Sequence, residues 1–473
     1  MEPLLAFNTA ISFITNTDWQ SYSGETTLSN FSQMTAITFP ITSATTGFVV
    51  AMAFIRAFFV RNGGADLGNF YRDFVRFITR VLMPVSLLLG LFAIWQGMPQ
   101  TLDTAVAAHP IQGCEQTIML GPVASLETIK HLGTNGGGFF NANAAHPFEN
   151  PTPLTNTVLM ILMALLPSAL VVCFGHMIGN RRQAWILYGV MGALLLLILP
   201  VTVLSEQHGT PILSQAGIAL QPDAGHPGGN MEGKEVRFGI AGSALFNVVT
   251  TSFTTGSVNS MLDSFTPLGA VPPFIGMMLQ CIFGGKGVGF LAALVYGLIA
   301  VFIAGLMSGR APEFLGKKIE RAEIMVSLAL LIHPLVILTP SSWSMIVPYG
   351  TSSLANAAMH GYSEVLYAFS SAAANNGSAF AGLNANTPWY NLWLGIVIMA
   401  GRYPPTIFMM AVAGSVAAKP TLEPTVGTLR TDTLKFGIFW FGTILVVGAL
   451  TFFPALVLGS IAEYFAMKSG HTF

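Results

Sequence analysis

Charged residues are scarce in this chain. Only 9% of its 473 residues are Asp, Glu, Lys or Arg, and 52% are hydrophobic, whereas an ordinary soluble domain has about 25% charged residues. This composition excludes a string of soluble domains, the usual expectation for a chain of this length. Cysteine is also rare. Cys114, Cys173 and Cys281 lie far apart in the sequence, which excludes a disulfide framework and a cysteine-based metal site.

Long apolar runs take the place of the missing charges. A helix needs about 20 mostly apolar residues to cross the roughly 30 Å hydrocarbon core of a membrane. Eight stretches qualify: 34–58, 75–97, 155–178, 184–204, 271–307, 323–341, 390–416 and 434–460. The sequence therefore predicts an all-α, polytopic membrane protein that forms one integral unit.

Most of the 20 Lys and Arg residues lie in alternate loops between these runs or close to the ends of the runs. This set consists of Arg56, Arg61, Arg72, Arg76, Arg80, Arg181, Arg182, Arg310, Lys317, Lys318, Arg321, Lys419, Arg430 and Lys435. The opposite loops hold only Lys130, Lys234, Arg237 and Lys468. Because loops rich in Lys and Arg stay in the cytoplasm, we expect the second set of loops and both termini of this chain to lie outside.

A short polar phrase recurs between the apolar runs at nearly constant intervals. It reads Thr134-Asn135-Gly136, Thr254-Thr255-Gly256 and Asn375-Asn376-Gly377, and a fourth version, Thr15-Asn16-Thr17-Asp18-Trp19-Gln20, precedes them. All four fall on the expected outer side. Backbone carbonyls of an extended loop can replace the water around K⁺ or Na⁺, and glycine lets such loops approach closely. Four re-entrant loops therefore predict an ion pore with pseudo-fourfold symmetry. The alternative is that each glycine serves only helix packing or a turn.

The segments around each phrase follow one order: a spanning helix, a short semi-apolar segment, the phrase, a helix-start signal and a second span. We expect repeats at 1–60, 61–180, 181–310 and 311–418, with an extra transmembrane helix in 419–473. Thr152-Pro153, Thr266-Pro267 and Thr387-Pro388 suit helix starts, and Thr27-Leu28-Ser29-Asn30 takes their place in the first repeat. No complete span precedes the first phrase, so we expect the first repeat (pore loop and second helix only) to be truncated at its N-terminus. A degenerate repeat is the alternative.

Two basic residues fall near the middle of apolar runs, far from the ends of the runs. Lys286 lies in the glycine-rich stretch 283–289, where the run 271–307 is too long for one straight span and invites a break. Arg402 is followed by Tyr403-Pro404-Pro405, which predicts a kink or break in its helix. Intramembrane charges usually mark function, so we expect Lys286 to gate or tune an ion pathway. Snorkelling to an interface is the alternative for both residues.

The chain resembles, over nearly its whole length, the KdpA family of potassium-binding subunits of the Kdp P-type ATPase complex. The matching stretches are 15–25, GTNGGGFFN at 133–141, HPFENPT at 146–152, NMEGKEVRFG at 230–239, GRAPEFLGKKI at 309–319 and SSAAANNGSAFAG at 370–382. The resemblance implies a fold of four helix–pore loop–helix repeats. It also implies a bacterial plasma (inner) membrane location, with K⁺ selected from outside and passed through an intramembrane tunnel to the pump subunit.

Carried over residue by residue, the resemblance implies an ion-binding filter of Asn16, Thr17, Asp18, Gln20, Thr134, Asn135, Gly136, Thr254, Thr255, Gly256, Asn375, Asn376 and Gly377. It also implies gating or tunnel roles for Gln280, Lys286, Arg402 and Arg310. Three residues depart from the family pattern. Asp18 stands where Asn is usual, Gln280 where an acid is frequent, and Lys286 where an uncharged residue is common.

Three function classes remain open. The first is a non-catalytic ion-binding subunit, with membrane lipid, the catalytic P-type ATPase subunit and small accessory subunits as partners, K⁺ as the bound ion, and no nucleic acid. The chain has no Asp-Lys-Thr-Gly phosphorylation motif and no Gly-x4-Gly-Lys-Ser/Thr loop, so we expect no ATPase activity from it alone. The second class is an autonomous Trk/Ktr-like potassium channel or uptake protein gated by a soluble partner. The third is a non-conducting membrane scaffold.

Overall fold

The fold is seen in a computed structural model that describes residues 1–60, 64, 66–223, 228–285, 287–423 and 428–470. Within these residues, eight helical segments are long and apolar enough to cross a membrane. They are Asn30–Phe59, Phe70–Trp95, Pro153–Met177, Arg181–Gln215, Val288–Ser308, Arg321–Ile346, Pro388–Ala418 and Leu434–Lys468. The expected polytopic helical architecture is confirmed. Seven predicted runs each coincide with one of these segments, and the run 271–307 divides into a shorter helix, Pro267–Leu279, and the segment Val288–Ser308.

The helices follow the predicted repeat order. The first two repeats contain α1 (Pro3–Ile14), α2 (Gly24–Thr27) and α3 (Asn30–Phe59), then α4 (Phe70–Phe77), the π-helix η1 (Ile78–Leu82), α5 (Met83–Trp95), α6 (Val123–Leu132), η2 (Asn143–Ala145) and α7 (Pro153–Met177). The third contains α8 (Arg181–His208), α9 (Pro211–Gln215), α10 (Gly239–Ser252), η3 (Leu262–Ser264), α11 (Pro267–Leu279) and α12 (Val288–Ser308). The fourth contains α13 (Arg321–Ser327), η4 (Leu328–Leu331), α14 (Ile332–Ile346), α15 (Pro348–Thr351), α16 (Ala358–Ala374) and α17 (Pro388–Ala418), and α18 (Leu434–Leu456), η5 (Val457–Ile461) and α19 (Ala462–Lys468) follow. The residue boundaries between repeats stay a prediction.

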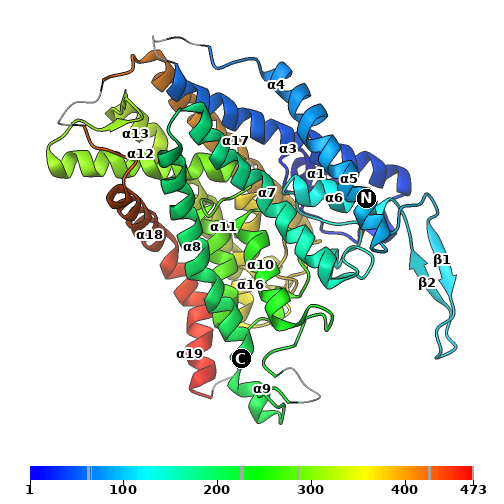
Figure 1. The fold of residues 1–473 in the computed structure, drawn as a ribbon. Coiled ribbons are helices and arrows are strands. Elements are labelled where there is room, and N and C mark those ends of the chain that lie inside the picture. Colours follow the sequence, from blue (N-terminus) through cyan, green and yellow to red (C-terminus); the bar gives the residue numbers. More distant parts are fainter. Residues whose placement is uncertain (61–63, 65, 224–227, 286, 424–427, 471–473) are drawn as a thin grey trace.

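Two short antiparallel hairpins interrupt the helical pattern. The first pairs β1 (Ala105–Ala108) with β2 (Gln116–Met119) and projects from the body of the molecule (Figure 1). The second pairs β3 (Glu313–Phe314) with β4 (Lys317–Lys318) just after α12. The sequence pattern did not predict either hairpin, because their strands are too short to produce a clear alternation of apolar and polar residues.

The expected helix-start signals are confirmed. The side chains of Thr152, Thr266 and Thr387 each accept a hydrogen bond from a backbone N–H in the first turn of α7, α11 and α17, and a proline follows each cap. Ser29 caps α3 in the same way. Local sequence therefore sets where the helix after each pore loop begins.

The predicted break in the apolar run 271–307 is also confirmed. Helix α11 ends at Leu279, Gln280 takes the left-handed conformation with φ 53°, and α12 begins at Val288. At Pro404 and Pro405, in contrast, the helix does not break. Helix α17 runs on to Ala418, packed against α1, α3 and α16, so tertiary packing holds a segment that its prolines would weaken.

Four short helices define the site. Helices α1, α6, α10 and α16 each end where one polar phrase begins. Longer helices surround α10, α11 and α16 (Figure 1). We call α1, α6, α10 and α16 the pore helices, and the segments that follow them the first to fourth loops.

Candidate ion-binding site

The four loops leave their pore helices with the same backbone geometry. Each pore helix ends in a left-handed residue: Asn16, Thr134, Thr254 and Asn375, with φ of 69°, 45°, 44° and 52°. The N–H of the next residue in each loop binds a carbonyl in the preceding helix: Thr17 to Ser12 (3.0 Å), Asn135 to Lys130 (2.9 Å), Thr255 to Thr250 (2.8 Å) and Asn376 to Ser371 (2.9 Å). This capping geometry satisfies carbonyls that the helix end would otherwise leave unpaired. The loops are thus structurally equivalent although their sequences differ.

The central position of the loops explains the glycines. Gly256 and Gly377 have φ of 99° and 97°, a region that side chains strongly disfavour. The φ of Gly136 does not lie in this region. Glycine is needed there for lack of space, because a Cβ would collide with the carbonyl oxygen of Thr17. In the first loop Asp18 holds the equivalent place, with φ 52°.

Contacts between these glycines show that all four loops meet. A Cβ on Gly256 would collide with the carbonyl oxygen of Asn376 in the fourth loop, and a Cβ on Gly377 with that of Thr17 in the first. A Cβ on Gly136 would lie 2.6 Å from the Asn376 oxygen and 2.8 Å from the Cα of Gly377. Two backbone carbonyls therefore lie directly against glycines of neighbouring loops, at one convergence point.

Asparagine side chains brace one loop against the next. Asn16 Nδ2 donates to the carbonyl of Thr134 at 3.0 Å, and Asn375 Nδ2 donates to Thr17 Oγ1 at 3.0 Å. Asn376 Nδ2 donates to the carbonyl of Thr250 at 3.0 Å. These hydrogen bonds couple the position of each loop to its neighbours.

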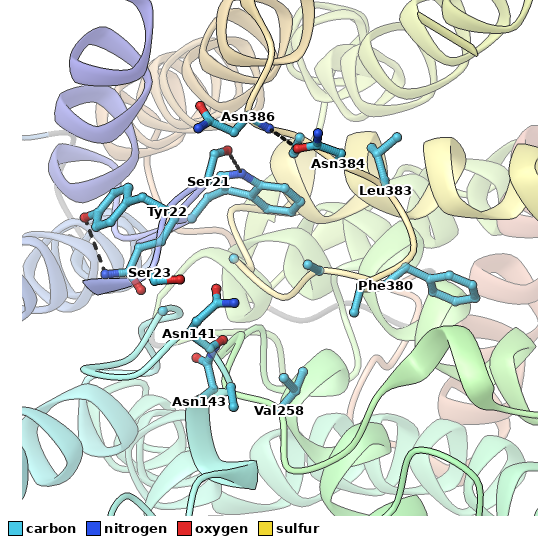
Figure 2. Close-up of a pocket in the computed structure, with 18 of the residues that line it drawn as sticks. Ser21, Tyr22, Ser23, Asn141, Asn143, Val258, Phe380, Leu383, Asn384 and Asn386 are labelled. Atoms are coloured by element: carbon cyan, nitrogen blue, oxygen red, sulfur yellow. Dashed lines mark hydrogen bonds between the residues drawn. The ribbon is translucent and has the colours of Figure 1, made fainter. Parts of the chain in front are cut away.

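The convergence point lies between two cavities. On one side is a large pocket of about 710 Å³, whose lining includes Gln20, Gly137 and Gly377. Asparagine amides from separate loops surround it, among them those of Asn141 and Asn384 (Figure 2). On the other side is a small cavity of about 10 Å³, lined by Asn16, Thr134, Thr254, Asn375, Gln280 and Arg402. The loops thus form a partition between the two cavities.

The electrostatics of the partition favour a cation. All four pore helices direct their C-terminal ends at it, where the helix dipole places partial negative charge. Asp18 adds a carboxylate that is only 2% exposed. Arg402 lies beside the first loop, where its Nε donates to the carbonyl of Thr15 at 2.8 Å. Since Arg402 lines the small cavity and is not among the residues that line the large pocket, the two sides of the partition differ in charge.

The remaining predicted site residues fall in different places. Gln280 borders the small cavity, and its Nε2 donates to the carbonyl of Ala373 at 3.3 Å. Arg310 is exposed just after the C-cap of α12. It does not lie near the loops, because the whole length of α12 separates it from Gly287, the N-cap at the other end of this helix. Lys286 lies outside the described residues.

Sequence reasoning missed a buried ionic cluster behind the second loop. Lys130 Nζ lies 2.6 Å from Glu127 Oε1 and 3.1 Å from Glu149 Oε2, and the three side chains are at most 1% exposed. The signal in the sequence was weak, because a Glu–Lys pair three residues apart is a common feature of exposed helices.

Comparison with known proteins identifies the family. The family model described as the potassium-transporting ATPase A subunit, KdpA, matches residues 1–465. A protein of Delftia acidovorans named as a potassium-transporting ATPase potassium-binding subunit is 53% identical over 474 residues, covering 100% of this chain and 83% of that protein. A protein of Geobacillus kaustophilus with the same name is 50% identical over 470 residues, covering 99% of this chain and 82% of that protein.

A solved structure supports the fold. The potassium transporter TrkH from Vibrio parahaemolyticus superposes with a TM-score of 0.57 over 87% of this chain and 78% of that one, at 12% sequence identity. At this identity the likeness concerns the fold alone, and it agrees with the four pore helix–loop–helix units and the extra C-terminal helix seen here. The sequence matches go further: this chain belongs to the KdpA family of potassium-transporting ATPase A subunits.

Proposed function

We propose that this chain is the potassium-binding and translocating subunit of an ATP-driven, high-affinity potassium uptake complex. The observation that carries the proposal is the meeting of four equivalent loops, with the carbonyls of Thr17 and Asn376 held against glycines of the other loops. The names of relatives about half identical over the full chain support the choice of K⁺ as the ion.

In this proposal the filter faces outward and consists of Asn16, Thr17, Asp18, Gln20 and the three phrases 134–136, 254–256 and 375–377. K⁺ enters from the large pocket and exchanges its water for loop oxygens. Two candidate ligands are Asn135 Oδ1 and Thr255 Oγ1, which are buried and have no hydrogen-bond partner among the described residues. The bracing amides hold the loops that carry these oxygens in place before the ion arrives.

The small cavity provides the way out. Gln280 borders both this cavity and a second one of about 20 Å³, which is also lined by Tyr296 and Thr451. We propose that K⁺ leaves the filter sideways past Gln280 toward the catalytic subunit. The Arg402 guanidinium opposes straight passage, Lys286 acts as a gating cation, and Arg310 marks the cytoplasmic end of α12.

The chain itself is non-catalytic in this proposal. The phosphorylated pump subunit would supply the energy, with small accessory subunits and membrane lipid as the other partners. The complex would lie in the bacterial plasma membrane, with both termini of this chain outside. Transport would then require assembly.

The experiment compares the chain alone with the assembled complex. We expect K⁺ binding by isothermal titration to the purified chain in nanodiscs, co-purification of the catalytic subunit, and ATP hydrolysis that K⁺ stimulates. Robust K⁺ flux from the chain alone in liposomes would contradict the subunit role and support an autonomous channel. Absence of K⁺ binding in both forms would indicate a scaffold.

A further inference from the structure

One position distinguishes the second loop from the other three. It is the pore-helix residue whose carbonyl caps the loop: Ser12, Lys130, Thr250 and Ser371. The Thr250 hydroxyl accepts a hydrogen bond from the N–H of Gly256 at 3.0 Å, and the Ser371 hydroxyl accepts one from Gly377 at 3.1 Å. In the first loop the N–H of Asp18 binds the Ser12 carbonyl at 3.1 Å. A lysine ammonium has no acceptor to offer, so the Lys130 side chain cannot accept a hydrogen bond from the N–H of Gly136 as the Thr250 and Ser371 hydroxyls do in their loops.

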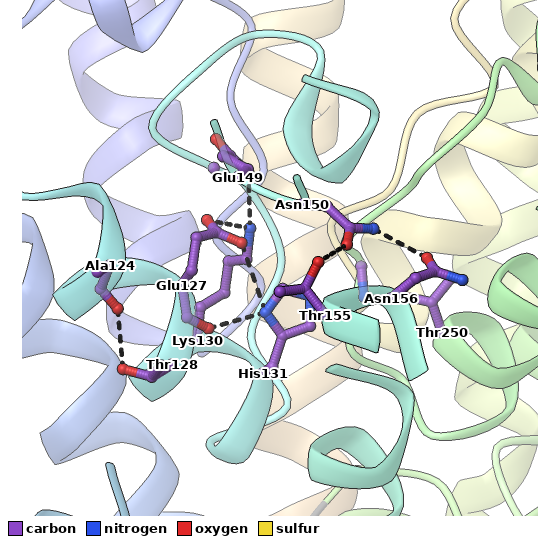
Figure 3. Close-up of polar contacts among 12 residues, drawn as sticks. Ala124, Glu127, Thr128, Lys130, His131, Glu149, Asn150, Thr155, Asn156 and Thr250 are labelled. Carbon is purple, nitrogen blue, oxygen red and sulfur yellow. Dashed lines mark hydrogen bonds and ion pairs between the residues drawn. The ribbon is translucent and has the colours of Figure 1, made fainter. Parts of the chain in front are cut away.

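Lys130 instead joins the pore helix to the outgoing part of its loop (Figure 3). Its ammonium binds Glu127 within α6 and Glu149 beyond the loop. Glu149 Oε1 in turn accepts a hydrogen bond from the N–H of Phe140 at 2.7 Å. A Cβ on Gly138 would lie 2.7 Å from the same oxygen, so the carboxylate packs directly on the loop backbone. The ion pair thus connects the second loop to its pore helix, a role that the Thr250 and Ser371 hydroxyls have in the third and fourth loops.

The outgoing part of the second loop has further acidic and amide partners. Gln20 Oε1 accepts from the N–H of Gly138 at 3.0 Å, and a Glu25 carboxylate oxygen accepts from Asn141 at 3.0 Å. Both partners belong to the first repeat. Glu149 is the partner that links this segment to its own pore helix, through Lys130. A change at Lys130 therefore acts on the second loop without removing its contacts with the first.

Burial makes this connection stiff. An ion pair closed off from water is weakly screened, and removal of Lys130 leaves two buried carboxylates without a counter-charge. A free ammonium behind a cation filter would also oppose K⁺, and the ion pairs with Glu127 and Glu149 offset its charge. Resting on the proposed function above, we infer that Lys130 and Glu149 are positioning residues of the second loop, and that their ion pair sets the discrimination between K⁺ and Na⁺.

The first test is independent of ion binding. Hydrogen exchange of the backbone amides at 136–141 is measured on the full chain in nanodiscs for wild type, Lys130→Met and Glu149→Gln. We expect exchange in this segment to become at least about tenfold faster in both variants. The matched control is Lys234→Met, because Lys234 forms an equally buried pair with Glu206 at 2.7 Å in the third repeat. Unchanged exchange in Lys130→Met, or an equal change in Lys234→Met, would overturn the positioning role.

The second test separates positioning from simple loss of stability. The neutral variant Glu127→Gln/Lys130→Met/Glu149→Gln leaves no unpaired charge, so we expect it to recover thermal stability relative to Lys130→Met. Its K⁺/Na⁺ affinity ratio, from competition titrations, should stay at least about fivefold below wild type. A wild-type ratio in this variant would overturn the role in discrimination. If wild type itself binds no K⁺, the proposed function fails, and the exchange experiment still decides whether the ion pair positions the loop.

Discussion

Replacement of Gly256 by alanine tests the filter directly. Gly256 combines a φ of 99° with a neighbouring carbonyl, that of Asn376, in the place where a Cβ would lie. The backbone conformation alone costs alanine roughly 1–2 kcal/mol. In addition, the Asn376 oxygen must move by roughly 1 Å or more to reach an ordinary contact distance from the new methyl group.

The magnitude follows from what that oxygen does. If the Asn376 carbonyl is a K⁺ ligand, its displacement removes an interaction comparable to a hydrogen bond to a charged group, about 1.5–3 kcal/mol. This corresponds to a loss of K⁺ affinity of about tenfold to a hundredfold. Because the displaced oxygen leaves the loops less closely packed, we expect Na⁺ affinity to fall less, so that the K⁺/Na⁺ ratio falls too.

The assay is isothermal titration with K⁺ and with Na⁺, alongside the amount of folded protein and its thermal midpoint. Gly189→Ala is the matched control, because Gly189 lies in α8 with open space where a Cβ would be, and alanine there should stabilise the helix slightly. Unchanged K⁺ affinity in Gly256→Ala would refute the reasoning. A loss of affinity no larger than the loss of folded protein would make Gly256 a folding residue.

Three further predictions follow from individual side chains. Asp18→Asn should lower K⁺ affinity by about threefold to tenfold and raise the K⁺/Na⁺ affinity ratio, because it removes a buried carboxylate at the filter. Both quantities are measured by competition titration. No change in the affinity or in the ratio would place the carboxylate outside the ion's reach. His360 binds Asp263 and Glu463 at 2.8 Å each; burial alone would lower its pKa, but these two hydrogen bonds raise the pKa to about 10. Because the pKa is raised in the folded state, protonated His360 stabilises the fold fully below the unfolded pKa of about 6.5, and this contribution is lost as pH rises toward 10. The thermal midpoints of wild type and His360→Gln should therefore converge over that pH range. A constant difference would contradict a charged His360 between Asp263 and Glu463. Lys286→Ala should change K⁺ flux or coupling in the assembled complex without changing the apparent affinity at the filter, and an unchanged transport rate would leave Lys286 a packing residue.

The features that the sequence determined by itself are local or periodic. Apolar runs long enough to cross a membrane predicted each spanning segment, because length and hydrophobicity act through the lipid and need no tertiary partner. Thr152, Thr266 and Thr387 marked helix starts for an equally local reason, the hydroxyl that caps a neighbouring N–H. The equal spacing of the phrases predicted four similar loops, since a repeated sequence folds as a repeated unit.

What only the tertiary structure decided is how the four loops fit together. Gly136 needs its glycine because the Thr17 carbonyl lies against it, a contact between residues far apart in the chain that no local pattern encodes. Helix α17 continues through Pro404 because its neighbours hold it. Lys130 looked like one more residue of a polar loop, yet its charge is buried between two glutamates. Burial and long-range contact define the surroundings of each loop, and these arise only when all four repeats are folded together.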